Sequence, residues 1–257
     1  MSATTDTRTY DPVNISSLNF WAQSPRERDV RLSELRQNRP VSWQPPAEGG
    51  MATPENDGYW AVTSNSLITY VSRNPELFCS GEVIQMAEIL TVMLEAVSGF
   101  LAMDGERHMA MRKLASNAFT PKQVKRLEEG IRGRAVGIVD RLLEIGEGDF
   151  VQNVSKLMPM NTFYDVAGLP EQYREQAAHN ADEMAAWNDP DVANGREPGA
   201  VLVDGAIGNL SIGLEFAELT RANPRDDVWS NLVRAEIDGN KLTDDELATM
   251  FVLLSFA

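Results

Sequence analysis

A histidine and an arginine stand four residues apart near the middle of the chain. His108 and Arg112 lie in the run Asp104–Leu114, and on a helix residues with this spacing share one face. Together they would offer an imidazole donor beside a permanently charged guanidinium fork, which suits a dianionic ligand with two carboxylates or phosphates. The same spacing is common on solvated helix faces, so the spacing alone leaves both interpretations open.

Basic residues are concentrated around this pair. Positions 107–134 hold eight basic residues and two acidic ones, although the whole chain has a net charge of −15. A basic patch on an acidic protein suggests an acidic partner surface, and a solvated pair of helices would give the same pattern. The overall acidity argues against nucleic acid and against anionic membranes as partners.

Several other chemistries lack the residues that they need. The 257 residues include two histidines and one cysteine, Cys79, so we expect no zinc-type metal site and no internal disulfide. Cys79 itself is expected to be a small buried filler rather than a metal ligand. No phosphate-binding glycine loop, signal peptide or uninterrupted membrane-spanning run is evident, and a cytoplasmic location fits best. A reaction would therefore need an organic cofactor, catalytic residues that are scattered along the sequence, or a part of the protein that these 257 residues do not include.

The elements that would position these side chains are mostly helices. Turn and capping signals predict a mainly α fold with a small β-sheet near the N-terminus. The clearest helix begins at Thr120-Pro121 and ends near Gly146, with one apolar face. That face consists of Val124, Leu127, Ile131, Ile138, Leu142 and Ile145. The other predicted elements are strands at 40–43 and 59–63 and helices beginning at 24, 64, 150, 171, 200 and 223.

The last predicted helix differs from the others. Thr243 and Glu246 form a capping box, and the helix that follows, Leu247–Ala257, is apolar almost all round. A helix of this kind is central and covered on every side. Because no cap or polar exit follows, we expect the chain to be truncated within this helix and to expose apolar surface there.

The run from His108 to Pro121 resembles the C-helix region of bacterial cytochrome P450 enzymes. Other stretches fit the same family in the same order, in the style of its soluble actinobacterial members. These stretches are Gly58–Thr63, Asn74–Ser80, Gly168–Pro170, Asp226–Gly239 and Leu242–Leu247.

The resemblance implies a cytochrome P450 fold truncated within the I helix. Residues 1–257 would be the N-terminal portion of a single domain: the A helix and first hairpin, the B–C loop, helices C to H and the start of the I helix. The C-terminal half with the haem ligand would be absent. The catalytic residues and the axial cysteine are therefore expected beyond Ala257.

The resemblance also implies which residues form the site. His108 and Arg112 would hold a propionate of haem b, and Ala257 would face the haem. Residues 80–100, which by their pattern alone could equally form a buried helix with ragged ends, would roof an apolar substrate pocket. The expected pocket residues are Ile84, Met86, Leu90, Met93, Phe100, Leu253 and Phe256.

The function implied is that of a haem-thiolate monooxygenase. The complete enzyme would hydroxylate a hydrophobic small molecule with O₂ and with electrons from an acidic ferredoxin docked on the basic helix. The 257 residues alone would be inactive. The alternative from another class is a cofactor-free helical binding or scaffold protein. Fatty acids, terpenoids and steroids suit an apolar roof equally well.

Overall fold

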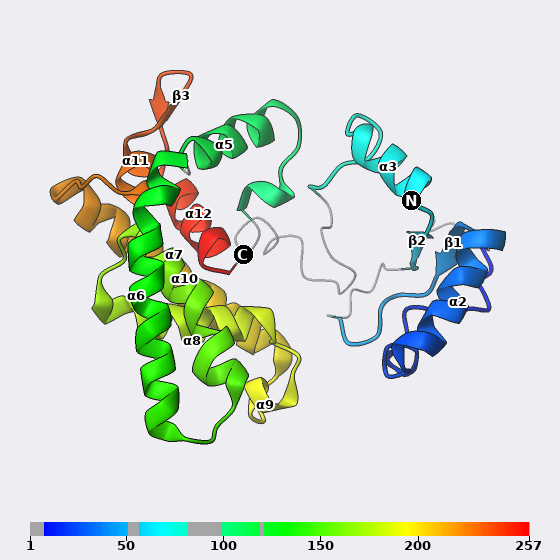
Figure 1. The fold of residues 1–257 in the computed structure, drawn as a ribbon. Helices are drawn as coiled ribbons and strands as arrows, with labels where there is room; N and C mark the ends of the chain where they lie inside the picture. Colours follow the sequence, from blue (N-terminus) through cyan, green and yellow to red (C-terminus); the bar gives the residue numbers. More distant parts are fainter. Residues whose placement is uncertain (1–7, 51–56, 82–98, 119–120, 257) are drawn as a thin grey trace. The chain divides into compact units, whose positions relative to one another are not determined.

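The structure is a computed structural model that describes residues 8–50, 57–81, 99–118 and 121–256. It consists of two compact units, residues 1–94 and residues 95–257, which are described separately below. Most of the described elements are helices, and the paired strands are short, so the predicted mainly α fold is confirmed (Figure 1).

The described residues of the first unit form a short sheet and three helices. Ser24 caps helix α2 and forms a capping box with Glu27, as the sequence predicts. Ser64 caps helix α3 through a hydrogen bond from the backbone N–H of Leu67. The elements are α1 (Leu18–Trp21), α2 (Pro25–Asn38), β1 (Val41–Gln44), β2 (Tyr59–Val62) and α3 (Asn65–Arg73).

The two strands of the first unit form an antiparallel hairpin. Val41 pairs with Val62 and Trp43 pairs with Trp60, whose rings lie 5.2 Å apart. Such cross-strand aromatic pairs stabilise a sheet. A small apolar cluster includes Ala61 of the hairpin, and its buried members are Val13, Ile15, Phe20, Leu35 and Ala61.

The second unit is a helical bundle. Several of its short elements were not predicted, namely η1, the four-residue helix α9 and the strands β3 and β4. The π-helical turn η2 lies within the helix that was predicted to begin at residue 150. The elements are η1 (Gly99–Ala102), α5 (Gly105–Ala118), α6 (Pro121–Ile145), η2 (Val151–Ser155), α7 (Leu157–Ala167), α8 (Glu171–Ala185), α9 (Pro190–Ala193), α10 (Pro198–Ala222), α11 (Val228–Arg234), β3 (Glu236–Ile237), β4 (Asn240–Lys241) and α12 (Asp244–Phe256).

Helix α12 lies at the centre of the second unit. It packs against α8 and α10, and Figure 1 shows these helices together behind α6. Phe251 contacts Phe216 and Trp229, whose own rings are stacked 5.2 Å apart. Leu247 and Val252 are fully buried as well, so the prediction of a central helix is confirmed. The expectation that this helix exposes apolar surface is wrong for these residues, because α8 and α10 cover them.

Helix α6 follows the predicted bounds but not the whole predicted face. Ile138 is buried, whereas Ile145, the last residue of the helix, is 43 % exposed. The side chains of Val124 and Leu127 lie outside the described residues.

Helix α10 qualifies a second expectation. The sequence suggested no membrane-spanning run, yet α10 is long and apolar enough to cross a membrane by length and composition. Half of its apolar stretch is buried inside the protein, as in the core helix of a globular fold.

Candidate functional site

The predicted His108 is fixed by the short helix that precedes α5. Its Nδ1 atom lies 2.8 Å from the carbonyl oxygen of Phe100 in η1. The two rings meet edge to face, with centroids 5.9 Å apart and an interplanar angle of 70°. Both side chains are partly buried, so the imidazole has one fixed orientation.

Helix η1 in turn lies on the central helix α12. Gly99 has a φ of +51°, and a Cβ atom there would stand 3.3 Å from the carbonyl oxygen of Thr249 and 3.4 Å from the Leu253 side chain. A glycine permits both the backbone conformation and this close approach. Leu253 is only 4 % exposed. Three predicted site residues, Phe100, His108 and Leu253, are thereby brought together around η1.

Arg112 lies one turn beyond His108 on the same face of α5. It is exposed and makes no hydrogen bond or ion pair with the part of the chain that the structure describes. A guanidinium beside an imidazole is a donor set that binds carboxylates and phosphates, so the residues present fit an anionic group such as a haem propionate.

The basic residues of α5 and α6 divide into two groups. Arg107 pairs with Glu246 at 3.0 Å, and Arg134 pairs with Asp165. Arg132 pairs with Glu128 at 3.8 Å. By contrast, the exposed cations without an ion pair among the described residues are Arg112, Lys113, Lys125 and Arg141.

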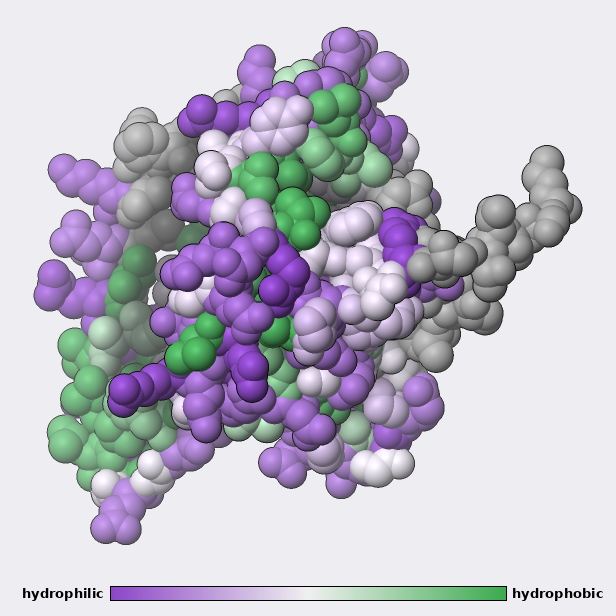
Figure 2. All heavy atoms as spheres, turned by 90° about the vertical axis from the view of Figure 1, so that its right-hand side faces the viewer, coloured by the Kyte–Doolittle hydropathy of each residue, from purple (hydrophilic) through white to green (hydrophobic). Residues whose placement is uncertain are grey.

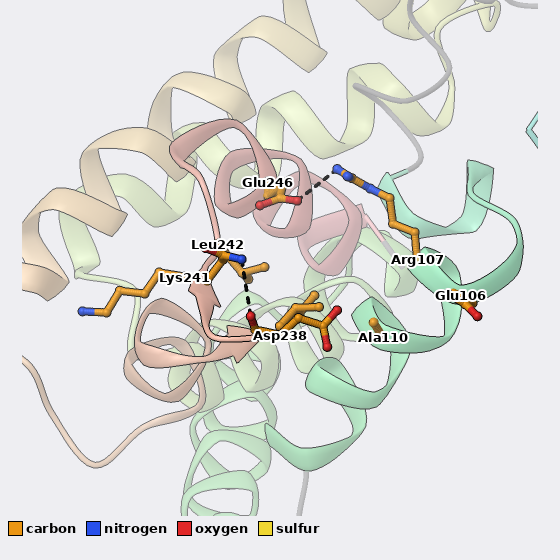
Figure 3. Close-up of a pocket in the computed structure, with 9 residues that line it drawn as sticks. Glu106, Arg107, Ala110, Asp238, Lys241, Leu242 and Glu246 are labelled. Carbon is orange, nitrogen blue, oxygen red and sulfur yellow. Dashed lines mark hydrogen bonds and ion pairs between the residues drawn. The ribbon is translucent and has the colours of Figure 1, made fainter.

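A pocket of about 490 Å³ lies on the face of α5 opposite to His108 and Arg112 (Figure 3). Glu106, Arg107 and Ala110 line it, and at 100° per residue these positions point away from His108 and Arg112. The other side is formed by the β3–β4 hairpin and the start of α12. Figure 3 shows the Arg107–Glu246 ion pair across this pocket.

The sequence did not predict this pocket. Its only sequence signals are the turn at Asp238-Gly239 and the capping box at Thr243, in which Glu246 accepts the Thr243 N–H at 2.8 Å. Neither signal shows that the hairpin lies beside α5, because Glu246 and Arg107 are 139 positions apart in the sequence. In Figure 3 the Lys241 side chain extends away from the other labelled residues.

Several predicted site residues lie outside the residues that the structure describes. Phe256 belongs to α12, but its side chain lies outside the described residues. The other predicted site residues outside the described residues are Ile84, Met86, Leu90, Met93 and Ala257.

Cys79 corrects a further expectation. It was predicted to be a small buried filler, but it is exposed, as are its neighbours Leu77 and Phe78. These residues follow the end of α3 in a loop, and the described part of their unit does not cover them.

Curated proteins resemble the chain over most of its length. The methyl-branched lipid omega-hydroxylase of Mycobacterium tuberculosis is 32% identical over 250 residues, which are 95% of this chain and 57% of the relative. The steroid C26-monooxygenase of Mycolicibacterium smegmatis is 34% identical over 236 residues, 88% of this chain and 53% of that protein. The chain therefore spans about half the length of the curated relatives that it matches. No protein-family model matches it.

Solved structures resemble the chain as well. The structure of the Mycobacterium marinum cytochrome P450 CYP268A2 in complex with pseudoionone has a TM-score of 0.90 and 45% sequence identity, and the match covers 97% of this chain and 61% of that one. CYP108D1 from Novosphingobium aromaticivorans has a TM-score of 0.71 at 22% identity over 90% of this chain and 55% of that one. The second likeness concerns the fold alone.

Proposed function

Because the sequence and the fold of the chain are those of part of a cytochrome P450, we propose that the complete protein is a haem monooxygenase that hydroxylates a hydrophobic small molecule. The observation that carries this proposal is the 45% identity to CYP268A2 over 97% of the chain. The haem b of such an enzyme activates O₂ for insertion of one oxygen atom into the substrate.

The residues of this chain would hold and orient the cofactor. Arg112 would donate to a haem propionate from its guanidinium, and His108 would donate from the ring nitrogen that Phe100 does not occupy. Burying an anion requires charged or hydrogen-bonding partners, and this pair supplies them from one helix face. Ala257 would lie against the haem.

Apolar residues would bind the substrate and exclude water. Phe100 follows Gly99, which packs against Leu253 of α12, and Leu253 is buried. The names of the relatives, a methyl-branched lipid hydroxylase and a steroid monooxygenase, favour a lipid or a steroid as the substrate class. The remaining wall would come from Ile84, Met86, Leu90, Met93 and Phe256.

The electron donor would be an acidic ferredoxin. Arg112, Lys113 and Lys125 are exposed cations on a chain whose net charge is −15, and an acidic partner would be steered toward them. Because electrostatic steering is screened by salt, reduction of the enzyme should slow as ionic strength rises.

The 257 residues alone should be inactive, and the protein should be cytoplasmic. Their only thiol is Cys79, which is exposed. A single cysteine forms no internal disulfide, which suits a reducing compartment.

The experiment that tests the function uses the complete protein that contains this chain. The purified protein should show the thiolate-type Soret band in a reduced-CO difference spectrum. With a ferredoxin and its reductase, it should hydroxylate a methyl-branched fatty acid or a steroid side chain, detected by mass spectrometry. A protein that purifies without haem and takes up none would instead be the helical binding or scaffold protein.

A matched pair of variants tests the cofactor site. Arg112→Ala should speed transfer of haem to an acceptor protein by about tenfold, which corresponds to about 1.4 kcal/mol of lost interaction. Lys113→Ala removes an adjacent exposed cation and should leave the transfer rate unchanged. Equal transfer rates in the two variants would remove Arg112 from the site.

A further inference from the structure

We infer that the site at His108 is a proton-coupled carboxylate site: His108 takes up one proton when a carboxylate binds beside Arg112. This inference rests on the proposed function, because it takes a haem propionate as the carboxylate. It concerns the state of the ring, which the assignment of His108 to the site leaves open.

The contact with η1 fixes which ring nitrogen carries hydrogen. Nδ1 of His108 lies 2.8 Å from the carbonyl oxygen of Phe100. A carbonyl oxygen only accepts hydrogen bonds, so Nδ1 must be the donor and must carry the proton. In the neutral ring, Nε2 then holds a lone pair and can only accept.

A carboxylate cannot bind to that lone pair. An ionised carboxylate is an acceptor on both oxygens, so two acceptors would face each other. The ring could turn only by breaking the bond to Phe100 and the edge-to-face contact at 5.9 Å. The alternative is that Nε2 gains a proton from solvent, which makes the ring an imidazolium that donates from both nitrogens.

The position of Arg112 ties this proton to the ligand. Arg112 lies four residues from His108 on the same face of α5 and carries no ion pair with the described residues. Arg107, the preceding residue, is already paired with Glu246. A carboxylate that contacts both side chains accepts from the Arg112 guanidinium and needs a second donor at Nε2 of His108, so the proton and the carboxylate bind together.

Among the described residues, no ion pair or hydrogen bond is recorded between an acidic side chain and the ring of His108. Helix η1, which accepts the His108 hydrogen bond, carries no titratable side chain among Gly99–Ala102. Helix α11 packs on α5, and its Arg234 donates to the carbonyl oxygen of Arg225. The acids of α12 are Asp244, Asp245 and Glu246 in its first turn, of which Asp244 pairs with Arg221 and Glu246 with Arg107. Asp104 precedes α5 and accepts the His108 backbone N–H at 3.4 Å through its carbonyl oxygen.

Calorimetry on the complete apoprotein tests this inference. Binding of haemin at pH 8, where a free imidazole is mostly neutral, is measured in two buffers with different ionisation enthalpies, which gives the number of protons taken up. The wild type should take up about one proton more than His108→Gln, which donates without titrating. His179→Gln, which changes the chain's other histidine, should behave as the wild type.

Haemin dimethyl ester separates the carboxylate from the rest of the cofactor. It lacks both propionate charges, so the difference between wild type and His108→Gln should vanish with this probe. Equal proton uptake by wild type and variant with haemin itself would overturn the inference and leave the proposed function standing. Failure of the wild type to bind haemin would overturn both.

Nuclear magnetic resonance covers the case in which His108→Gln does not fold. With histidine labelled by ¹⁵N and diamagnetic zinc protoporphyrin IX as the probe, His108 should show one protonated ring nitrogen in the free protein at pH 8 and two in the complex. Comparison with His179→Gln identifies the His179 signal. A His108 ring that keeps a single protonated nitrogen in the complex would overturn the inference.

Discussion

Helices α12 and α6 are both rich in apolar residues, yet they are held in different ways. Helix α12 is surrounded, with Leu247, Phe251 and Val252 fully buried. Helix α6 leaves Val136, Val139 and Leu143 between 51 % and 75 % exposed. Figure 2 shows apolar side chains gathered at its lower left edge, the side of the molecule on which α6 lies. Apolar content is therefore a poor guide to burial, because burial depends on what packs against each face.

The contacts of α6 explain the contrast. One of its links to α7 is an ion pair between Arg134 and Asp165, and Arg174 of α8 donates to the same carboxylate at 2.9 Å. The contacts of α12 are aromatic and aliphatic instead. We therefore expect α12 to depend on shape and volume, and α6 to depend on charge and pH.

Removing a large side chain from α12 should have the largest effect. Phe251→Ala deletes a fully buried ring that contacts Phe216 and Trp229, and should lower the free energy of unfolding by about 3–5 kcal/mol. Urea unfolding followed by tryptophan fluorescence measures the change. A loss below 1 kcal/mol would mean that α12 is not held by this packing.

A pair of glycine substitutions compares a glycine in contact with a neighbouring helix with a glycine that has no neighbour. A Cβ atom at Gly213 of α10 would stand 2.9 Å from Cα of Ala248 in α12, so Gly213→Ala should destabilise by about 1–3 kcal/mol. At Gly137 of α6 nothing lies within 4 Å, so Gly137→Ala should stabilise by about 0.5–1 kcal/mol. Effects of the same sign in urea unfolding would contradict the contrast between the helices.

Acid should weaken the attachment of α6 more than that of α12. Burial raises the pKa of Asp165, but hydrogen bonds and charge from Arg134 and Arg174 outweigh it, so the net pKa is lowered. A lowered pKa in the folded state contributes stability above the unfolded value of 3.8, and this contribution is lost as the pH falls through the folded value. Asp165→Asn should cost about 1 kcal/mol at pH 7.

The pH dependence of that variant provides the check. The difference in free energy of unfolding between wild type and Asp165→Asn should shrink as the pH falls below about 4, where free aspartate titrates. The cost of Phe251→Ala should stay constant over the same range. A pH-independent cost of Asp165→Asn would show that the ion pair does not hold α6.

The exposed face of α6 should give the smallest effect. Leu143 is 75 % exposed, so Leu143→Lys should change the free energy of unfolding by less than about 0.5 kcal/mol. Leu247→Ala in α12 removes a fully buried side chain and should cost about 2–5 kcal/mol in the same urea experiment. A large loss for Leu143→Lys would mean that its face is covered in solution.

The sequence alone determined the features that depend on short spacing. The capping boxes at Ser24–Glu27 and Thr243–Glu246 form as predicted, because a helix start satisfies its free N–H groups within one turn. His108 and Arg112 share a face of α5 for the same local reason. The resemblance carried by the chain's ordered motifs also pointed to the cytochrome P450 fold, which the comparison with CYP268A2 confirms.

Only the tertiary structure decided which distant residues meet. The carbonyl oxygen of Phe100 sets the tautomer of His108, and Gly99 of the same short helix η1 packs closely against Thr249 and Leu253 of α12. No spacing in the sequence predicts this contact between η1 and α12. The ion pair between Arg107 and Glu246, which are 139 positions apart in the sequence, likewise depends on the tertiary fold. Periodicity predicts which face of a helix is apolar, but whether that face is covered depends on partners elsewhere in the chain.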